Sequence, residues 1–598
     1  MQQVQTMALT PRPDNAAVTS ALRQALGTCR SSFILAGFLS LFINMLLLLP
    51  SIYMLQIYER VLSFNSESTL LMLTLIAVFL FMVMGGLEWV RSQILIVAGA
   101  RLDLLLGGRV FDSVFTQTLL SGGRIASAQP LGDLLQLRQF LTGPGLFAFF
   151  DAPWLPIYIA VMFLFHPAFG VTAIIAAMIL LGLAIWNEVA TRDDLKEANR
   201  HALESSNHTQ RNLRNAEVIE AMGMLPRMRE RWQQRQDLLL ALQSRASRKA
   251  GLITAASKTF RISIQSLVLG LGAFLAIHHD ISPGVVFAGS ILLGRALAPI
   301  DLLINTWRGF LAAREAYARL DALLSAPPAS APPMPLPAPR GELNLEKLVV
   351  TPPGAPGPVI KGISLLVPAG EMLAVIGPSA AGKSTLVRAM LGICRPSGGT
   401  VRLDGAELDQ WDREALGQYV GYLPQDVELL DGTISENVAR FGEIDADKVV
   451  SAAQAAGVHP MILRLPEGYG TRLVGNVLSA GQRQRIGLAR ALYGDPQVIV
   501  LDEPNSNLDQ DGEAALARTL EDLKRAGRTV VVVTHRNKVL SLVDKILFLA
   551  EGQIAVYGSR DKVLATLEQA AAQQAATRGP TALMQHPTVA AQAVPQAE

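Results

Sequence analysis

The stretch Leu373-Ala-Val-Ile-Gly377-Pro-Ser-Ala-Ala-Gly382-Lys383-Ser384 joins a short apolar run directly to a glycine-rich loop of the pattern G-x-x-x-x-G-K-S. An apolar run of this length predicts a buried strand. The glycines allow successive main-chain N–H groups to surround a phosphate at the start of the following helix. The alternative is an ordinary glycine-rich turn between a strand and a helix. The strand directly before the loop favours a phosphate-binding site.

The side chains that close this loop have predicted roles in binding a nucleotide. Lys383 would reach the β- and γ-phosphates, and the hydroxyl of Ser384 would bind Mg²⁺. The residues that we expect to contact the nucleotide are Gly377, Pro378, Ser379, Ala380, Ala381, Gly382, Lys383, Ser384 and Thr385.

A second apolar run, Val498-Ile-Val-Leu, ends in the two carboxylates of Asp502 and Glu503. We expect it to form a buried strand beside the phosphate loop. Asp502 would hold Mg²⁺ through water, and Glu503 would polarise the attacking water, because phosphoryl transfer depends on a positioned nucleophile and neutralised charge. Many strands end in acidic residues, so the run alone is weak support. Together with the phosphate loop it predicts a nucleotide-hydrolysing domain.

The surrounding sequence predicts an α/β domain at residues 341–568, because short β-branched runs alternate there with helical segments. Before it, residues 327–339 hold seven prolines in 13 residues, which indicates an extended linker within the connecting segment 313–340. After it, residues 569–598 are rich in alanine and glutamine and sparsely charged. We expect this tail to be disordered.

The composition predicts a membrane-embedded part. Of the 598 residues, 50% are hydrophobic and 17% are charged, and the mean hydropathy is +0.32. Soluble domains have about 25% charged residues. A net charge of +2 argues against binding of nucleic acid by bulk electrostatics. Two cysteines exclude a disulfide scaffold and a cysteine-rich metal site.

Apolar runs in the first half of the chain predict an all-α membrane domain of six transmembrane helices at residues 33–312, after an N-terminal segment at 1–32. Five of the runs have 17–23 residues, enough or nearly enough to cross a hydrocarbon core of ~30 Å, and the run at Ser266–Ile277 should start earlier, near Ile264. The predicted spans are Phe33–Leu55, Ser68–Leu87, Leu146–Phe165, Phe169–Ile185, Ser266–Ile277 and Val285–Leu303.

Basic residues predict the orientation of these spans. Asn187–Leu252 carries 12 Lys and Arg residues and Glu88–Gly145 carries five, whereas each alternate connection carries at most one. By the positive-inside rule, both basic loops and both termini are cytoplasmic. Both loops have helical patterns, so the membrane helices should continue into the cytoplasm. These loops could attract an acidic substrate, but topology accounts for their charge.

The segment Leu478-Ser-Ala-Gly-Gln482 is similar to the Leu-Ser-Gly-Gly-Gln signature of ATP-binding-cassette (ABC) proteins. Those proteins sandwich ATP between two cassettes, so the resemblance implies a homodimer. It also implies that Ser479, Gly481 and Gln482 would contact ATP bound to the phosphate loop of the other subunit.

The same resemblance implies roles for three further residues. Gln425 stands where the family has a glutamine that senses Mg²⁺ and the attacking water. Asp509, in Asn507-Leu-Asp509, matches the loop that couples the two ATP sites, and His535 matches the switch histidine. A lone histidine after a strand usually has a structural role, but here His535 completes an ordered set of motifs.

Three departures from the family pattern affect the site. Ala480 replaces the first signature glycine, which could slow turnover. Pro352 and Pro353 stand where an aromatic residue usually stacks on adenine. Thr471–Val477 is shorter than the glycine-rich segment that exporters usually carry before the signature, so the contact with the membrane domain could differ.

Four membrane segments resemble the type I secretion permease/ATPases of the PrtD, AprD and HasD kind. They are Ser51–Leu62, Phe140–Trp154, Asn215–Gly223 and Ile291–Ile300. The resemblance implies a multi-pass protein of the Gram-negative inner membrane that energises one-step secretion of unfolded polypeptide. Its implied partners are a periplasmic membrane-fusion adaptor, a TolC-like outer-membrane channel, membrane lipid, and a glycine-rich, RTX-like substrate with a C-terminal signal.

Other functions remain open. A homodimeric exporter of lipid, peptide or small molecules would have the same motifs. A cassette ATPase of DNA repair or translation is opposed by the six spans, and a non-transporting scaffold by the intact Lys383, Asp502, Glu503 and His535. Arg295, inside the last span, indicates either a polar pathway or a position near the membrane surface, paired with Asp301 or another acid. Short helices near Phe111–Leu120 and Ala216–Gly223 should dock on the cassettes.

Overall fold

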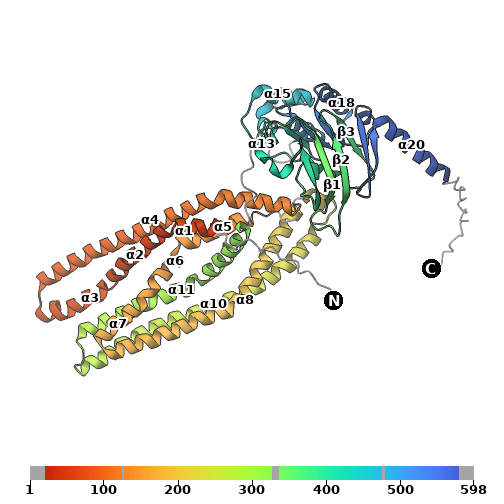
Figure 1. The fold of residues 1–598 in the computed structure, drawn as a ribbon. Helices are drawn as coiled ribbons and strands as arrows, with labels where there is room; N and C mark the ends of the chain where they lie inside the picture. Colours follow the sequence, from red (N-terminus) through yellow and green to blue (C-terminus); the bar gives the residue numbers. More distant parts are fainter. Residues whose placement is uncertain (1–20, 124–126, 214, 326–335, 474–477, 578–598) are drawn as a thin grey trace, which may run out of the picture. The chain divides into compact units, whose positions relative to one another are not determined.

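The computed structural model describes residues 21–123, 127–213, 215–325, 336–473 and 478–577, which form two compact units. The first, here called the helical unit, includes residues 21–118 and 127–325, and the second, here called the cassette, includes residues 336–577. Figure 1 shows that the helical unit (red to yellow-green) consists of helices and that the cassette (green to blue) contains the strands. The last helix of the helical unit ends at Leu324, and the first strand of the cassette begins at Leu343.

The helical unit is built from a few long helices joined by short connections. Its helices are α1 (Ala21–Thr28), α2 (Arg30–Leu46), α3 (Leu49–Gln56), the π-helix η1 (Ile57–Leu62), α4 (Glu67–Leu120), α5 (Gln129–Thr142), α6 (Pro144–Asp151), the 3₁₀ turn η2 (Ala152–Trp154), α7 (Leu155–Phe165), α8 (Pro167–Leu213), α9 (Ala216–Ala221), α10 (Leu225–Ile277) and α11 (Pro283–Leu324).

The six predicted spans are confirmed. Among the described residues, six helical stretches are long and apolar enough to cross a membrane, and each contains one predicted span. Helices α4, α8, α10 and α11 have 54, 47, 53 and 42 residues. At 1.5 Å per residue they are about 60–80 Å long, roughly twice the thickness of the hydrocarbon core. They therefore continue beyond the spans, as the helical pattern of the basic loops predicts.

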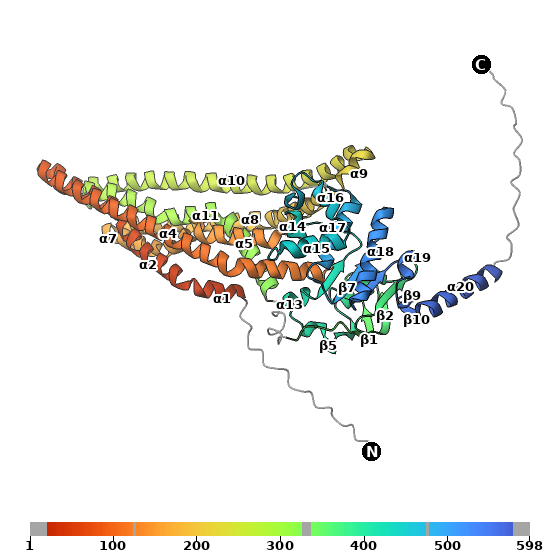
Figure 2. The ribbon, with the colours of Figure 1, turned by 90° about the horizontal axis from the view of Figure 1, so that it is seen from above.

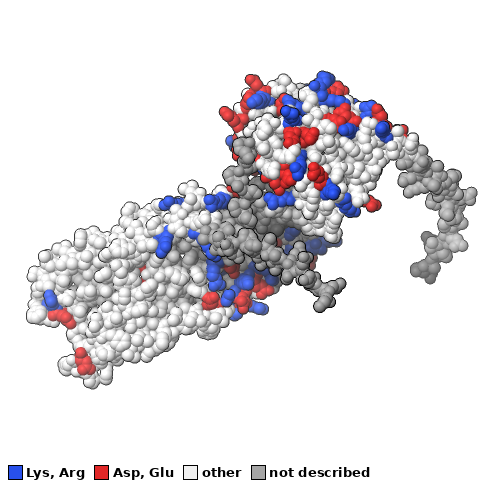
Figure 3. All heavy atoms as spheres, viewed as in Figure 1, with Lys and Arg blue, Asp and Glu red and all other residues white. Residues whose placement is uncertain are grey.

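Charge is distributed unevenly over the helical unit. In Figure 3, charged side chains gather toward one end of the helices, and most of the remaining visible surface of this unit is uncharged. Figures 1 and 2 both show α8 and α10 running side by side. The exposed apolar surface suits a lipid environment, because lipid tails solvate apolar side chains as well as a protein core does.

A cluster of polar side chains joins helices α2, α4, α6 and α7. Asn44 Nδ2 donates to Asp151 Oδ1 at 2.8 Å, and the Tyr158 hydroxyl donates to Asn44 Oδ1 at 3.0 Å. Arg91 Nη1 donates to Ser40 Oγ at 2.9 Å and lies 3.5 Å from Asp151 Oδ1. An unpaired charge among apolar helices costs about 2.5–3.5 kcal/mol on insertion scales. The pairing of Arg91 with Asp151 offsets that cost and fixes how these helices pack.

One of the interpretations of Arg295, a pairing with Asp301, is wrong. Asp301 Oδ2 lies 2.8 Å from Arg261 Nε, and its other oxygen accepts a hydrogen bond from Ser257 at 2.9 Å. Arg295 is exposed, and no carboxylate lies within ion-pair distance of it in the described part of the chain. Helix α11 begins at Pro283, close to the predicted start of the span. A polar pathway around Arg295 stays a prediction.

The cassette contains two sheets and the helices that cover them. Its strands are β1 (Leu343–Val350), β2 (Ile360–Val367), β3 (Met372–Ile376), β4 (Gly398–Leu403), β5 (Ala406–Glu407), β6 (Val420–Leu423), β7 (Val498–Asp502), β8 (Thr529–Val533), β9 (Lys545–Ala550) and β10 (Gln553–Ser559). Its helices are α12 (Lys383–Met390), η3 (Leu408–Gln410), α13 (Arg413–Gly417), α14 (Ile434–Val438), α15 (Ala446–Ala455), α16 (His459–Leu463), η4 (Gly468–Gly470), α17 (Ala480–Leu492), α18 (Gln510–Arg525), α19 (Asn537–Leu540) and α20 (Arg560–Thr577).

The larger sheet has the strand order β10-β9-β3-β8-β7-β6, and all neighbours except β10 and β9 are parallel. Strands β3, β7 and β8 are buried along their whole length, as their apolar runs predict. One face packs against α12 and the antiparallel sheet β2-β1-β4-β5, and the other against α14, α15, α17 and α18. This architecture confirms the predicted α/β domain.

Helix α20 ends at Thr577, so the chain stays helical past residue 568, where we expected a disordered tail to begin. The rest of that predicted tail, residues 578–598, lies outside the described residues.

Candidate nucleotide-binding site

The parallel strands of the larger sheet gather the predicted site residues at one edge. The phosphate loop follows β3, Asp502 ends β7, His535 follows β8 and Gln425 follows β6. Because these four strands are parallel, their carboxyl ends lie at the same edge, where ligands bind in open α/β sheets. Residues that are more than 150 positions apart in the chain therefore share one site.

The position of β7 differs from our expectation. We predicted a strand directly beside the phosphate loop, but β8 lies between β3 and β7 and pairs with both. The neighbour of β3 on this side is therefore β8 and not β7. The sequence does not show which strand is the neighbour, because all three strands are equally apolar. Asp502 still lies near the start of α12, where the hydroxyl of Ser384 lowers the pKa of its carboxyl.

The phosphate loop depends on glycine at its first position. Gly377 has a φ of 151°, and a Cβ atom there would lie 2.1 Å from the carbonyl oxygen of Leu549. A side chain at this position would therefore push the loop away from the sheet. Lys383 Nζ donates to the carbonyl oxygens of Gly377 and Pro378 at 2.9 and 3.0 Å. The lysine thus lies over the loop, as its predicted role requires.

The environment of Asp502 fits a bound Mg²⁺. Asp502 is 1% exposed, and its Oδ1 atom has no hydrogen-bond partner among the described residues. Burial raises the pKa of the Asp502 carboxyl, and this effect is larger than that of the Ser384 hydroxyl, which lowers the pKa. A divalent cation would satisfy this oxygen and stabilise the charged carboxylate. The hydroxyl of Ser384 and the carboxylate of Asp502 are the oxygen ligands that Mg²⁺ prefers.

Glu503 is held in an unusual backbone conformation beside Gln425. Its φ is 49°, in the left-handed region, which costs of order 1 kcal/mol for a residue with a side chain. The Glu503 N–H donates to Val533 O at 3.0 Å, which holds the backbone in place. Gln425 Nε2 donates to Glu503 Oε2 at 3.4 Å. The structure therefore brings together the predicted base and the predicted water-sensing glutamine.

Two buried polar side chains that sequence reasoning did not assign hold the loop after Glu503. Gln484, which is 2% exposed, donates to Glu503 O at 3.1 Å and accepts from the N–H of Asn507 at 3.0 Å. Asn505, which is 4% exposed, accepts from the Thr534 hydroxyl at 3.3 Å. A glutamine inside the otherwise apolar face of α17 is the sequence signal that could have identified the first contact.

The signature residues form the start of α17. The Ser479 hydroxyl accepts from the Gln482 N–H at 3.3 Å, and Gln482 Oε1 accepts from the Ser479 N–H at 2.9 Å, which is a capping box. A Cβ atom on Gly481 would lie 2.6 Å from Asn507 O, so glycine is required there. Ala480 is the exposed first residue of the helix, where a methyl group meets no obstacle.

The remaining predicted residues lie near the same edge with fewer contacts. Asp509 caps α18 by accepting from the Gly512 N–H at 2.8 Å and lies 3.9 Å from Arg485. His535 is exposed directly after β8, and within the described residues it makes no hydrogen bond. Pro352 is partly buried and Pro353 is exposed in the turn after β1. Of the short segment Thr471–Val477, residues 474–477 lie outside the described residues.

Comparisons with known proteins cover both units. Residues 33–297 match the ABC transporter transmembrane region, and residues 360–506 match the ABC transporter family. The chain is similar to the type I secretion system ATP-binding protein PrsD of Rhizobium meliloti (strain 1021), with 44% identity over 93% of this chain and 95% of that protein. It is 28% identical to the toxin RTX-I translocation ATP-binding protein of Actinobacillus pleuropneumoniae over 90% of this chain and 77% of that one.

A solved structure shares the fold. The structure of a bacterial Atm1-family ABC exporter with ATP bound is similar with a TM-score of 0.75 and 21% identity, over 95% of this chain and all of that one. At this identity the likeness concerns the fold alone: six apolar helices followed by an α/β nucleotide-binding unit.

Proposed function

Since the chain belongs to the ABC transporter family and is a relative of the type I secretion ATP-binding proteins, we propose that it hydrolyses ATP to export unfolded polypeptide. The observation that carries this proposal is the 44% identity to PrsD along 93% of the chain, through the membrane spans as well as the ATPase motifs. ATPase motifs alone are shared by transporters of every cargo, whereas similarity along the helical unit reports on what passes through it.

The roles that we assign to the cassette residues follow from their positions at the sheet edge. Main-chain N–H groups of Gly377–Gly382 would bind the phosphates of ATP, and Lys383 would leave the loop carbonyls for the β- and γ-phosphates. Ser384 and Asp502 would hold Mg²⁺, with Gln425 beside it. When bound, Mg²⁺ neutralises charge that develops on the phosphate oxygens.

Glu503 would orient and polarise the attacking water, and Gln425 and His535 would position that water and the γ-phosphate. The hydrogen bonds of Gln484 link the signature helix to the main chain of Glu503 and of Asn507. In a homodimer, Ser479, Gly481 and Gln482 would reach ATP on the other subunit, with Asp509 nearby. ATP would then join the two cassettes, and hydrolysis would separate them, so the transporter alternates between two states.

We place the protein in the inner membrane of a Gram-negative cell, with the cassette and both termini in the cytoplasm. The basic loops support this orientation, because 12 Lys and Arg residues lie in residues 187–252. A periplasmic membrane-fusion adaptor and a TolC-like channel would carry the polypeptide onward. The cargo we expect is an RTX-like protease, lipase or surface-layer protein with a C-terminal signal.

The test compares the culture supernatants of cells that carry the native protein or the Glu503→Gln variant. Mass spectrometry should find that one or a few large glycine-rich polypeptides disappear from the variant's supernatant. Glu521→Gln, on the surface of α18, is the matched control and should secrete normally. An unchanged supernatant, with the variant present in the membrane, would contradict polypeptide export and favour a lipid or small-molecule cargo.

A further inference from the structure

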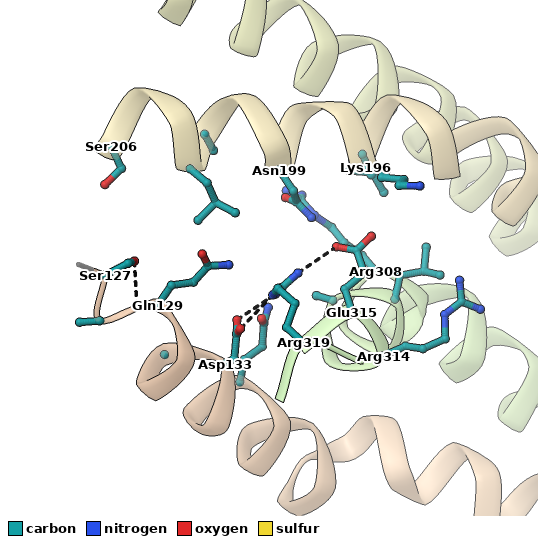
Figure 4. A pocket seen from close by; sticks show the side chains of 18 of the residues that line it. Ser127, Gln129, Asp133, Lys196, Asn199, Ser206, Arg308, Arg314, Glu315 and Arg319 are labelled. Atoms are coloured by element: carbon teal, nitrogen blue, oxygen red, sulfur yellow. Dashed lines mark hydrogen bonds and ion pairs between the residues drawn. The ribbon is translucent and has the colours of Figure 1, made fainter. Parts of the chain in front are cut away.

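A cavity of about 700 Å³ lies between α5, α8 and α11 of the helical unit, and the proposed role of the cassette does not use it. Its lining includes Arg192 and Lys196 from α8 and Arg308, Arg314 and Arg319 from α11. Figure 4 shows α8 along one side of the cavity and α5 and α11 along the other.

Both acidic side chains of this cavity are paired with Arg319. Arg319 donates from Nε and Nη2 to the two oxygens of Asp133, both at 2.8 Å, and its Nη1 lies 3.8 Å from Glu315 Oε2. Arg192, Lys196, Arg308 and Arg314 form no ion pair or hydrogen bond with any other described residue. Five cations and two carboxylates therefore line the cavity, which leaves it an excess of positive charge.

Membrane topology does not account for this arrangement. The positive-inside rule requires Lys and Arg in the cytoplasmic segments, and cations on the outer surface of a helix satisfy it equally well. Arg229 and Arg245, exposed on α10, are such cations. Four unpaired cations around one hollow repel one another, and a concave wall of low dielectric focuses their potential on whatever enters. This arrangement favours an anionic ligand.

A second cavity of about 160 Å³ adjoins the first, because Leu195 and Arg308 line both. Its lining includes Asn187, which is 6% exposed, and Trp307. The Asn187 Oδ1 and Trp307 Nε1 atoms are buried without a hydrogen-bond partner in the described part of the chain. One is an acceptor and the other a donor, and each unsatisfied group disfavours the empty cavity.

We infer that the two adjoining cavities form a binding site for an acidic segment of the exported polypeptide. Its carboxylates would bind at the four unpaired cations, and a main-chain amide would bind at Asn187 and Trp307. An extended polypeptide fits because it offers an N–H donor and a C=O acceptor in every residue. The inference rests on the proposed function, and it names the chemistry of the cargo: an unfolded segment that carries carboxylates.

The probe for this site is a fluorescein-labelled synthetic peptide of alternating glycine and aspartate, added to the full-length protein in lipid nanodiscs. We expect fluorescence anisotropy to show binding that weakens as salt is raised, because exposed ion pairs are screened. A second peptide replaces aspartate with asparagine, and a third keeps aspartate but ends in an amide. Loss of binding with the second peptide assigns the site to side-chain carboxylates, and loss with the third to a C-terminal carboxylate.

The variant that tests the site is the double replacement Lys196→Gln with Arg308→Gln. It should weaken binding of the aspartate peptide about five- to tenfold, since two partly exposed charge pairs are lost. Arg229→Gln with Arg245→Gln removes the same charge outside both cavities and should bind as the native protein does. Asn187→Leu should weaken binding of the aspartate peptide by a factor that does not change with salt, because this replacement removes no charge.

The readouts separate this inference from the proposed function. Basal ATP hydrolysis of each variant, measured in the same nanodiscs, should stay native and reports correct folding. If the double variant binds the peptide as tightly as the control while native cells still secrete polypeptide, the inference is wrong and the proposed function stands. If native cells secrete no polypeptide that depends on Glu503, the proposed function itself fails.

Discussion

The two units of this protein use their apolar residues in opposite ways. In the cassette, every residue of β3, β7 and β8 is buried within the protein. In the helical unit, only 6% of the most apolar window of α4 is buried, and 50% of that of α11. The cassette is thus held together by its own core, whereas the outer helices of the other unit present apolar side chains to lipid or to a second copy.

The polar residues of the two units also come together in different ways. Those of the cassette follow the ends of parallel strands, so their meeting is a consequence of sheet topology. Those of the helical unit meet through side-chain pairing between helices, as Asn44 and Asp151 do across 107 residues of sequence. Short motifs therefore determine the chemistry where strands align them, and buried pairs determine the packing where a general hydrophobic force is missing.

The largest effect that we expect concerns ATP turnover by the cassette. Glu503→Gln should lower ATP turnover by about 10²–10³-fold, because the water loses the carboxylate that polarises it. The purified variant should keep its dimer and trap ATP, which gel filtration and nucleotide analysis measure. Glu521→Gln should turn over normally. Rapid hydrolysis by the Glu503 variant would show that the strand-end motif does not determine the chemistry.

The next effect concerns the buried pair of the helical unit. Arg91→Met should destabilise the protein by about 3–5 kcal/mol, because it leaves Asp151 charged and unpaired. Adding Asp151→Asn should restore most of the loss, since the new amide still accepts from Asn44. Thermal unfolding in one detergent measures both, and Arg101→Met, exposed on the same helix, serves as the control. Equal thermal midpoints for the single and the double variant would show that the pairing of Arg91 with Asp151 does not stabilise the helical unit.

A smaller effect should appear at Asp502. Because burial raises the pKa of its carboxyl, the stability that this group contributes is fully present below its ordinary pKa and is lost as the pH rises through the raised value. At pH 7.5 without Mg²⁺, Asp502→Asn should therefore raise the thermal midpoint by roughly 2–4 °C. At acidic pH the difference should shrink.

The same variant should lose the stabilisation that Mg²⁺ gives the native protein, because the ligand charge is gone. Asp522→Asn, exposed on α18, should change neither property. If Asp502→Asn lowered the thermal midpoint at both pH values, the buried carboxylate would not destabilise the protein, and Mg²⁺ would have no such destabilisation to offset.

The smallest effect should come from Ala480→Gly, which restores the family signature. The residue is exposed at the first position of α17, so stability should fall by less than ~1 kcal/mol, the difference in helix propensity. Turnover should rise at most a few-fold, as steady-state ATP hydrolysis would measure. A much larger increase would show that the methyl group blocks closure of the dimer, which a single subunit does not reveal.

Much of this architecture could be predicted from the sequence. The spans follow from the length of apolar runs, and the phosphate loop follows from the spacing of its glycines and lysine. The position of β8 between β3 and β7 could not be predicted, because strands that are buried on both faces have no pattern that distinguishes their neighbours. Gln484 stands out in the sequence as a glutamine on an apolar helix face, but its partner is the main chain of a loop, so the sequence does not identify that partner.

The order of residues along the chain is enough to predict its chemistry: a phosphate loop, two acidic residues at a strand end and six apolar spans. These features depend on residues that are adjacent along the chain, so local geometry suffices. Three features depend on the folded chain: Arg91 meets Asp151, Asp301 meets Arg261 instead of Arg295, and four unpaired cations line one cavity. Such pairings depend on how each helix is rotated and placed against its neighbours, and that is set by packing over the whole bundle.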